Sequence, residues 1–358
     1  MRLSRQSSAM RHLSVPSHET ERILQMLSAA NALPDGARVQ PHPDDDNRRL
    51  IPVIDDFESE YPSMNMEANF PSSRTYREHL VDLLPLSTIS SIEWPTRHEF
   101  IGDLILIKLD DSQRPYGHEI GKALLLQHSR IRAVYEDRGV IGQFRVRELE
   151  LLAVRENSTP GTRTNIIESG QRLWTDPAKV YYSSRLSHER EGTLACAQKL
   201  RSTLGRPIDV CDPYAGVGPS LKPLISEDGL VRNLFGGDLN PAAIELLEEN
   251  IEHPSAQLEC ADALTLSKRN EMVNSWDLLL VNIPHNSLSH LPHLLPLLRT
   301  TGVVRGWAVV DESEFQQSEL LLQEILGMDV ELEIRRSYSA NSNLCRFEAW
   351  INGAPAGI

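Results

Sequence analysis

The chain has 358 residues, of which 40% are hydrophobic and 24% are charged. This length suits two or three domains of about 100 to 200 residues each, and no apolar run approaches the roughly 20 residues needed to span a bilayer, so no membrane partner is expected. The four cysteines show no C-x-x-C pairing and no neighbouring histidine cluster. The sequence therefore indicates neither a disulfide framework nor a metal site.

Charge is unevenly distributed along the chain. The net charge is −14, which taken alone argues against a nucleic-acid partner, because phosphate binding needs cations. Residues 97–205, however, carry a net charge of +3, whereas residues 1–96 carry −5 and residues 206–358 carry −12. Most of the cations are arginines, which bind phosphates through two hydrogen bonds and stack on bases. The composition of the middle segment thus permits RNA binding.

The N-terminal region is expected to contain a leader, a small module and a linker. Residues 1–17 hold several arginines and serines but no acid, which predicts a disordered leader and leaves a mitochondrial transit peptide as an alternative. In residues 18–55, helical spacing from Glu19 to Leu33, a turn at Pro34-Asp35-Gly36 and the strand RLIPVI predict a compact unit. The polar stretch from Asp55 to Ser73 predicts a linker.

Residues 56–180 are expected to combine this linker with a mixed α/β domain. Helices are predicted near Tyr76 to Leu84 and from Tyr116 to His128. The nearly continuous apolar run IGDLILIKL predicts one strand that is buried on both faces. Further strands are predicted in RIRAVYED and GVIGQFRVRELELLAV.

Residues 181–358 show the alternation of strand, Gly-rich turn and helix that is typical of a parallel sheet with crossover helices. Seven strands are predicted: IDVC, NLFGGD, AQLECAD, WDLLLVN, VVRGWAVV, VELEIRRSY and CRFEAWI. The last two follow each other without a crossover helix. The predicted fold class is therefore α/β, doubly wound, with a mostly parallel sheet.

The most informative stretch is DVCDPYAGVGPS, which places Asp212 at the end of a strand and then a turn that contains Gly216 and Gly218. Small residues in such a turn let the backbone approach a ligand closely. In a dinucleotide site a third glycine would complete G-x-G-x-x-G, but this chain has Leu221 there. The turn therefore favours a ligand without a pyrophosphate.

Polar residues end the following strands as well. Asp238 ends the second strand, where a carboxylate can accept hydrogen bonds from both hydroxyls of a ribose. Asp262 ends the third strand, where it can accept from an adenine amino group, and Asn282 ends the fourth. Because the carboxyl ends of parallel strands open onto one crevice, these side chains and Asp212 are expected to converge on a bound nucleoside.

From about His18 onward the chain resembles the archaeal and eukaryotic tRNA (guanine(37)-N1)-methyltransferases, a family related to the wybutosine-synthesis transferases. The matching pieces are EFIGDLILIKL, GVIGQFRVRELELLA, ESGQRLWTDPAKVYYSSRLSHERE, DPYAGVGPS, GGDLNP, CADA, VNIP and RRSYS. The resemblance implies a class I, Rossmann-like methyltransferase domain that transfers a methyl group from S-adenosylmethionine to N1 of guanosine 37. It further implies a cytoplasmic enzyme that acts as a single chain, with the middle domain and the N-terminal module holding the tRNA.

The resemblance also implies roles for individual residues. Glu189 would be the general base for the N1 proton, and Arg145 would stabilise charge that develops on O6. The positions that would line the target-base pocket are Tyr181, Arg185, Asn282 and Pro284. The cofactor-binding positions would include the two glycines of the Gly-rich turn. In full they would be Arg190, Asp212, Gly216, Gly218, Asp238, Leu239, Asp262, Ala263 and Asn282. Without the resemblance, Glu189 with Arg190 could be an exposed charged pair, and Arg145 with Arg147 a solvated strand face.

Some features depart from the family pattern and leave alternatives open. Pro213 and Tyr214 stand where the family usually has Met-Phe, Ser220 stands where it has an aromatic residue, and the fourth-strand motif reads NIPH. The acidic catalytic half and the Arg- and Ser-rich leader are also unusual. One alternative is a wybutosine-pathway transferase that moves an aminocarboxypropyl group or methylates the tricyclic intermediate, although the SSRL and NIP sequences favour methyl transfer. The other is a tRNA-binding homologue without turnover, which the intact Glu189 and Asp238 disfavour.

Overall fold

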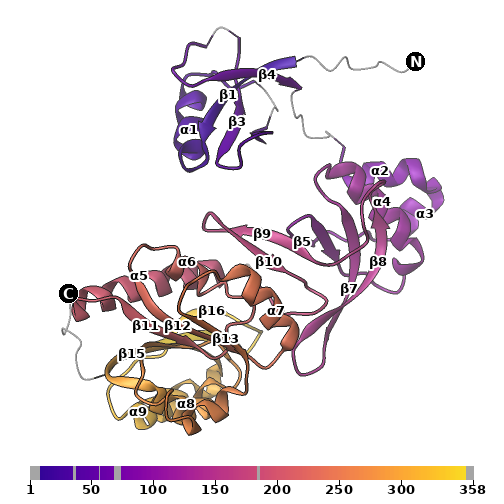
Figure 1. Ribbon diagram of the computed structural model, residues 1–358. Helices are drawn as coiled ribbons and strands as arrows, with labels where there is room; N and C mark the ends of the chain where they lie inside the picture. Colours follow the sequence, from indigo (N-terminus) through magenta and orange to yellow (C-terminus); the bar gives the residue numbers. More distant parts are fainter. Residues whose placement is uncertain (1–8, 35–37, 56, 68–73, 184–185, 352–358) are drawn as a thin grey trace, which may run out of the picture. The chain divides into compact units, whose positions relative to one another are not determined.

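The computed structural model describes residues 9–34, 38–55, 57–67, 74–183 and 186–351 (Figure 1). The chain divides into two units, and each is described by itself. The first unit comprises Met1–Trp94 with Lys122–Ser129, and the second comprises Pro95–Gly121 with Arg130–Ile358. No helix within the described ranges is long and apolar enough to cross a membrane.

The first unit contains a four-stranded antiparallel sheet in the order β2-β3-β1-β4, with a helix packed on it. The elements are β1 (Ala9–Pro16), η1 (Ser17–Glu19), α1 (Thr20–Ala29), β2 (Gln40–Pro41), β3 (Arg48–Pro52) and β4 (Ser63–Glu67). Alternate residues of β1, Leu13 and Val15, are fully buried against Ile23 and Leu27 of α1. This small apolar core holds the helix on the sheet.

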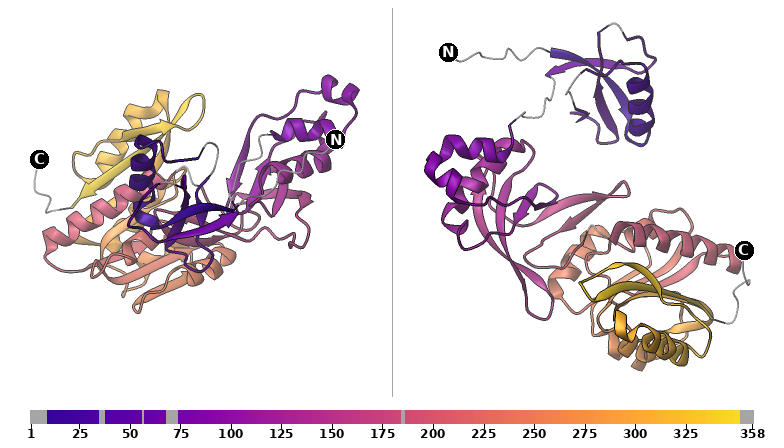
Figure 2. Two further views of the ribbon diagram at one scale, coloured as in Figure 1. Left: turned by 90° about the horizontal axis from the view of Figure 1, so that it is seen from above. Right: turned by 180° about the vertical axis from the view of Figure 1, so that it is seen from behind.

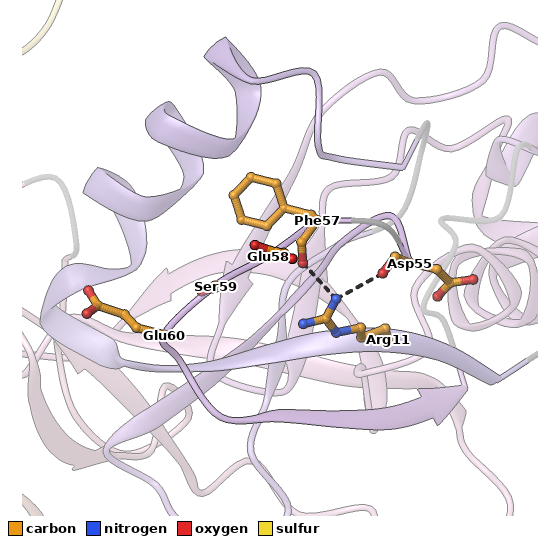
Figure 3. A pocket seen from close by; sticks show the side chains of 6 residues that line it. All are labelled: Arg11, Asp55, Phe57, Glu58, Ser59 and Glu60. Atoms are coloured by element: carbon orange, nitrogen blue, oxygen red, sulfur yellow. Dashed lines mark hydrogen bonds between the residues drawn. The ribbon is translucent and has the colours of Figure 1, made fainter.

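Two parts of the predicted organisation are wrong in this unit. Residues 9–16 of the expected leader form β1, and residues 63–67 of the expected linker form β4, which pairs with β1. Arg11, one of the residues that suggested a leader, donates hydrogen bonds to the carbonyl oxygens of Asp55 at 3.0 Å and Phe57 at 2.7 Å (Figure 3). Local composition is misleading here because β1 is stabilised by two strands far along the chain. The rest of the expected leader, residues 1–8, lies outside the described residues.

Two helices follow in the first unit, α2 (Tyr76–Leu83) and α3 (Leu86–Ser91). Thr75 and Glu78 form a capping box at the start of α2, which explains why the helix begins where the sequence predicts it. The short helix α3, which begins after Pro85, was not predicted. The helix expected over residues 116–128 is present as α4 (Gly117–Gln127).

The second unit begins with a four-stranded sheet in the order β5-β6-β7-β8, made of β5 (His98–Ile101), β6 (Leu104–Ile107), β7 (Ala133–Ile141) and β8 (Val146–Val154). The run IGDLILIKL is not the single strand that was predicted, because the chain reverses at Gly102 between β5 and β6. Gly102 has a φ of +57°, and a Cβ there would lie 2.2 Å from Oγ1 of Thr164. Glycine is therefore required at this reversal. All of β6 is buried, as its apolar sequence indicates.

The largest sheet of the described second unit is a seven-stranded mixed sheet in the order β13-β12-β11-β14-β15-β17-β16. The first five of these strands are parallel to one another. β17 is antiparallel to β15, and β16 is antiparallel to β17; Figure 2 shows this C-terminal edge in yellow. The strands are β11 (Ile208–Asp212), β12 (Val231–Asp238), β13 (Ala256–Cys260), β14 (Trp276–Val281), β15 (Leu298–Asp311), β16 (Glu333–Ser337) and β17 (Ser342–Trp350). The α/β class is thus confirmed, with a sheet that is mixed.

Helices cover both faces of this sheet (Figure 1). One face carries α5 (Ser187–Leu204), α6 (Lys222–Ile225) and α7 (Pro241–Asn250), and the other carries η4 (Ala263–Lys268), α8 (Ser287–Leu294) and α9 (Phe315–Leu326). The short 3-10 turns are η2 (Arg114–Tyr116), η5 (Leu295–Leu297) and η6 (Glu312–Glu314). Asn240 caps α7 by accepting a hydrogen bond from the amide of Ala242, and Pro241 occupies its first turn.

A hairpin joins the two sheets of the second unit: β9 (Thr164–Glu168) and β10 (Gln171–Thr175). The buried amide of Asn250 donates to the carbonyl oxygens of Trp174 at 2.9 Å and Val217 at 2.8 Å, and accepts from the amide of Trp174 at 2.7 Å. Leu173 and Val217 belong to one apolar cluster with residues of β6 and β7. The hairpin is therefore fixed to the Gly-rich turn that follows β11.

Candidate active site

Asp212 stands at the carboxyl end of β11 and is fully buried. Its Oδ2 accepts a hydrogen bond from Nδ2 of Asn282 at 2.7 Å, and its Oδ1 accepts from the amide of Tyr214 at 3.1 Å. Burial, together with the nearby charge of Asp238, raises the pKa of Asp212 to about 7 in spite of these hydrogen bonds. The ends of β11 and β14 thus meet in a single polar cluster.

Asp238 ends β12 and organises the Gly-rich turn. Its carboxylate accepts from the amide of Gly216 at 3.0 Å and from the amide of Asn240 at 2.9 Å. Burial raises the pKa of Asp238, although these backbone hydrogen bonds oppose the shift. Gly216 has a φ of +55° with open space beside its Cα, whereas a Cβ on Gly218 would lie 2.7 Å from Leu247. The turn therefore leaves room for a ligand at Gly216 and needs close packing at Gly218.

The end of β13 contributes a third carboxylate. Asp262 is exposed and accepts a hydrogen bond from the amide of Leu264 at 3.0 Å, which caps η4. Ala263 beside it is buried, and Leu239 after Asp238 is 54% exposed. This part of the site combines an accessible carboxylate with an exposed apolar side chain, a combination that suits an adenosine.

Glu189 lies in the first turn of α5 and is buried, with 8% of its surface exposed. Its Oε1 accepts from Nε of Arg335 at 2.7 Å, and its Oε2 accepts from Nε1 of Trp307 at 3.2 Å. Burial acts to raise the pKa of Glu189, but the hydrogen bonds from Arg335 and Trp307 outweigh it, so the pKa is lowered overall. Glu189 is therefore an ionised carboxylate at neutral pH with a donor on each oxygen.

Arg190, the next residue, is buried as well, so the alternative of an exposed Glu189–Arg190 pair is wrong. Nε and Nη2 of Arg190 donate to the two carboxylate oxygens of Glu168, and Nη2 also donates to the carbonyl of Ser183 at 3.0 Å. Tyr182 donates to the same carboxylate, and its ring lies 5.6 Å from the guanidinium carbon. Arg190 is thus joined to β9 through Glu168, a residue that sequence reasoning did not single out although it opens the matching run ESGQRLW.

Arg145 occupies the exposed tip of the β7–β8 hairpin, with a φ of +53°. Its Nη2 donates to the hydroxyl of Tyr338 at 3.5 Å, and that hydroxyl lies 2.9 Å from Nε2 of His285. The rings of His285 and Tyr338 meet edge to face, with centroids 5.3 Å apart. The hairpin of the four-stranded sheet therefore reaches the carboxyl end of the seven-stranded sheet.

For the other predicted site residues the structure gives fewer contacts. Tyr181 is 54% exposed, and the carbonyl of Pro284 accepts from the amide of Val309 at 2.7 Å. Arg185 lies outside the described residues. Arg147 does not form a solvated face with Arg145, since it pairs with acids of β5 and β7 at 2.8 and 2.9 Å.

A seven-stranded α/β sheet with a Gly-rich turn and carboxylates at its strand ends defines an S-adenosylmethionine-dependent methyltransferase. Family models support this class: the TRM5/TYW2 methyltransferase domain matches residues 164–330, and the TYW2 N-terminal domain matches residues 76–156. The Trm5b tRNA (guanine(37)-N(1))-methyltransferase of Pyrococcus abyssi is 30% identical over 84% of this chain and 85% of its own length. The chain belongs to the tRNA (guanine(37)-N(1))-methyltransferase family.

Other relatives agree with this assignment. The Trm5b enzyme of Methanocaldococcus jannaschii is 29% identical over 71% of each chain. The crystal structure of Pyrococcus abyssi Trm5b has a TM-score of 0.60 at 26% identity, over 95% of this chain and 98% of that one. A complex of aTrm5 with tRNALeu shares the fold, with a TM-score of 0.60 at 22% identity over 95% of this chain and 99% of that one.

Proposed function

We propose that this enzyme transfers a methyl group from S-adenosylmethionine to N1 of guanosine 37 in tRNA and that Glu189 is the general base. The observation that carries the assignment is the buried, ionised carboxylate of Glu189 in the same unit as the strand-end carboxylates Asp212 and Asp238. Guanine N1 holds a proton at neutral pH and is a poor nucleophile, so its methylation needs a base within hydrogen-bond reach. Glu189 is the group proposed to meet that need.

The strand ends suit the cofactor. When bound, S-adenosylmethionine supplies an electrophilic methyl group on a sulfonium. Asp238 would accept from the ribose hydroxyls, and Asp262 from the adenine amino group. The open space beside Gly216 leaves room for a ligand close to the backbone. The other positions proposed to line the cofactor site are Arg190, Asp212, Gly218, Leu239, Ala263 and Asn282.

The proposed reaction is a direct displacement. A bond forms between guanine N1 and the methyl carbon, the bond from that carbon to sulfur breaks, and Glu189 takes the N1 proton. Arg145 would stabilise the negative charge that develops on O6. Tyr181, Arg185, Asn282 and Pro284 would shape the pocket that receives the base. The guanosine must leave the anticodon loop to enter it, as bases do in other enzymes that act on them.

The remaining assignments concern how the tRNA is bound, whether one chain suffices and where in the cell the enzyme acts. We propose that residues 97–205, which carry the positive net charge, and the module over residues 18–55 hold the tRNA. A single chain suffices on this proposal, because the acids and arginines assigned to the reaction all belong to it. The cytoplasm is the proposed location, with mitochondrial import through the Arg- and Ser-rich start of the chain as the alternative.

We expect the enzyme to label an unmodified tRNA transcript with guanosine at position 37 and to leave the matched adenosine-37 transcript unlabelled. Two preparations of S-adenosylmethionine distinguish the alternatives, one labelled in the methyl group and one in the carboxyl carbon. Transfer of the methyl label alone supports the proposal. Transfer of the carboxyl label would establish aminocarboxypropyl transfer instead. Binding of the cofactor without any transfer to this transcript would favour either the wybutosine-pathway transferase, whose substrate is the tricyclic intermediate, or the tRNA-binding homologue.

Asp238→Asn is expected to weaken binding of S-adenosylmethionine by about tenfold or more, because hydrogen bonds to a charged acceptor contribute roughly 1.5 to 3 kcal/mol. Isothermal titration calorimetry on the free enzyme measures this directly. Glu259→Gln is the matched control, since Glu259 lies on the adjacent strand β13 and pairs with Arg269. An unchanged affinity in the folded Asp238→Asn protein would remove Asp238 from the cofactor site.

A further inference from the structure

The last residues of β16 and the residue after it contact both of the proposed catalytic side chains. Arg335 of β16 binds Glu189 of α5, and Tyr338 contacts Arg145 at the tip of the β7–β8 hairpin. Both residues belong to the RRSYS motif, which the proposed reaction leaves without a role. One short segment, residues 335–338, thus contacts both Glu189 and Arg145, although these two side chains belong to different elements of the fold.

Arg335 fixes one side of the Glu189 carboxylate. Its Nε donates to Oε1 at 2.7 Å, while Trp307, which is buried, donates to Oε2 at 3.2 Å. Arg335 also pairs with Glu333, and Glu333 pairs with Arg346, so the guanidinium is itself held from a second side. Each carboxylate oxygen has a second lone pair, so a carboxylate held in this way can still accept the N1 proton.

Tyr338 fixes the direction of a hydrogen-bond chain. Because an arginine can only donate, Nη2 of Arg145 donates to the Tyr338 hydroxyl at 3.5 Å. The hydroxyl proton is then available to Nε2 of His285, 2.9 Å away, which requires a neutral imidazole. Burial, together with the charge of Arg145, lowers the pKa of His285, in agreement with that state. Without Tyr338, the exposed side chain of Arg145 would be free to adopt many rotamers, and ordering it on a bound base would cost conformational entropy.

We propose that Arg335 and Tyr338 are positioning residues, with Arg335 orienting the carboxylate of Glu189 and Tyr338, supported by His285, orienting the guanidinium of Arg145. The inference rests on the proposed function, because it takes Glu189 and Arg145 as the groups that act on guanine. The two residues at this edge of the sheet would then together set the positions of the general base, Glu189, and of the cation, Arg145. Neither positioning residue is proposed to touch the reacting atoms.

The test for Arg335 is the pH dependence of kcat/KM for methyl transfer, which reports the ionisation of the free enzyme. Activity is lost as the pH falls through the pKa of the base, and Arg335 helps to keep that pKa low. Arg335→Gln should therefore move the acid limb to higher pH, and Arg335→Lys should restore part of the shift. Arg269→Gln removes a surface pair with Glu259 and should leave the limb in place.

The test for Tyr338 is the single-turnover rate with saturating tRNA. Tyr338→Phe should lower this rate by about tenfold and change KM for tRNA by less than about twofold, since only the hydroxyl is removed. The same change in an Arg145→Ala background should cost no further activity, because the two residues would act as one unit. Tyr135→Phe is the control, since the hydroxyl of Tyr135 is buried and has no partner among the described residues.

The outcomes separate this inference from the proposed function. If Glu189→Gln retains full activity, the assignment of the base fails, whatever the other variants do. If Glu189→Gln is inactive but Arg335→Gln keeps the wild-type pH limb and Tyr338→Phe keeps the wild-type rate, the positioning inference alone is overturned. Additive losses in the Tyr338→Phe, Arg145→Ala double variant would likewise overturn the role of Tyr338.

Discussion

Glu189→Gln is expected to lower the single-turnover rate of methyl transfer by about 10²- to 10⁴-fold, the usual contribution of a general base. A glutamine has nearly the same shape as the glutamate, but its amide cannot take the N1 proton. Affinity for S-adenosylmethionine should stay near that of the wild-type enzyme, because Glu189 is not among the residues proposed to bind the cofactor. Rapid mixing of excess enzyme with labelled cofactor and a guanosine-37 transcript measures the rate.

The substitution also affects packing, so it needs a matched control. Glutamine can still accept from Trp307 through its oxygen, but its NH₂ group then faces the Arg335 donor, and some stability will be lost. Thermal unfolding with and without S-adenosylmethionine therefore accompanies the rate measurement. Glu191→Gln changes an exposed carboxylate on the same helix and should leave the rate unchanged. A folded Glu189→Gln enzyme within about twofold of wild type would mean that another group takes the proton.

The parts of the site that could be predicted from the sequence are those that depend on nearby residues. Asp212 and Asp238 stand directly after apolar runs, and the carboxyl ends of parallel strands necessarily open onto one crevice. The sequence therefore predicts that their side chains lie near the Gly-rich turn. The start of α7 is equally local, since Asn240 caps the helix and Pro241 begins it.

The parts that could not be predicted depend on partners far along the chain. Glu189 meets Trp307 and Arg335, which are 118 and 146 residues away, and no spacing rule connects them. The same reason explains the error over residues 9–16, which belong to an Arg- and Ser-rich segment but form a strand held between β3 and β4. The hairpin at Gly102 was missed for a different reason, because a tight reversal inside an apolar run does not interrupt the hydrophobic pattern.

The second large effect concerns Asp212 and the dependence of stability on pH. Its pKa is raised to about 7 in the folded protein, mainly by burial, against an ordinary value near 3.8. Between about pH 4 and pH 7 the folded state therefore binds more protons at this site than the unfolded state does. The stabilisation from protonated Asp212 is fully present below the lower pKa and is lost as the pH rises through 7. For this group alone, the loss between pH 5 and pH 8 is roughly 2 to 3 kcal/mol.

Asp212→Asn should remove that loss, so the difference in unfolding free energy between variant and wild type should shift by roughly 2 to 3 kcal/mol in favour of the variant from pH 5 to pH 8. Urea unfolding at the two pH values measures the shift, and the exposed Asp228→Asn is the control. The neutral side chain can keep both contacts if the Asn282 amide turns to present its oxygen, because asparagine both donates and accepts. A pH-independent difference would show that Asp212 is already ionised in the folded enzyme at pH 5. Its hydrogen bonds from Asn282 and Tyr214 would then outweigh the cost of burying the charge.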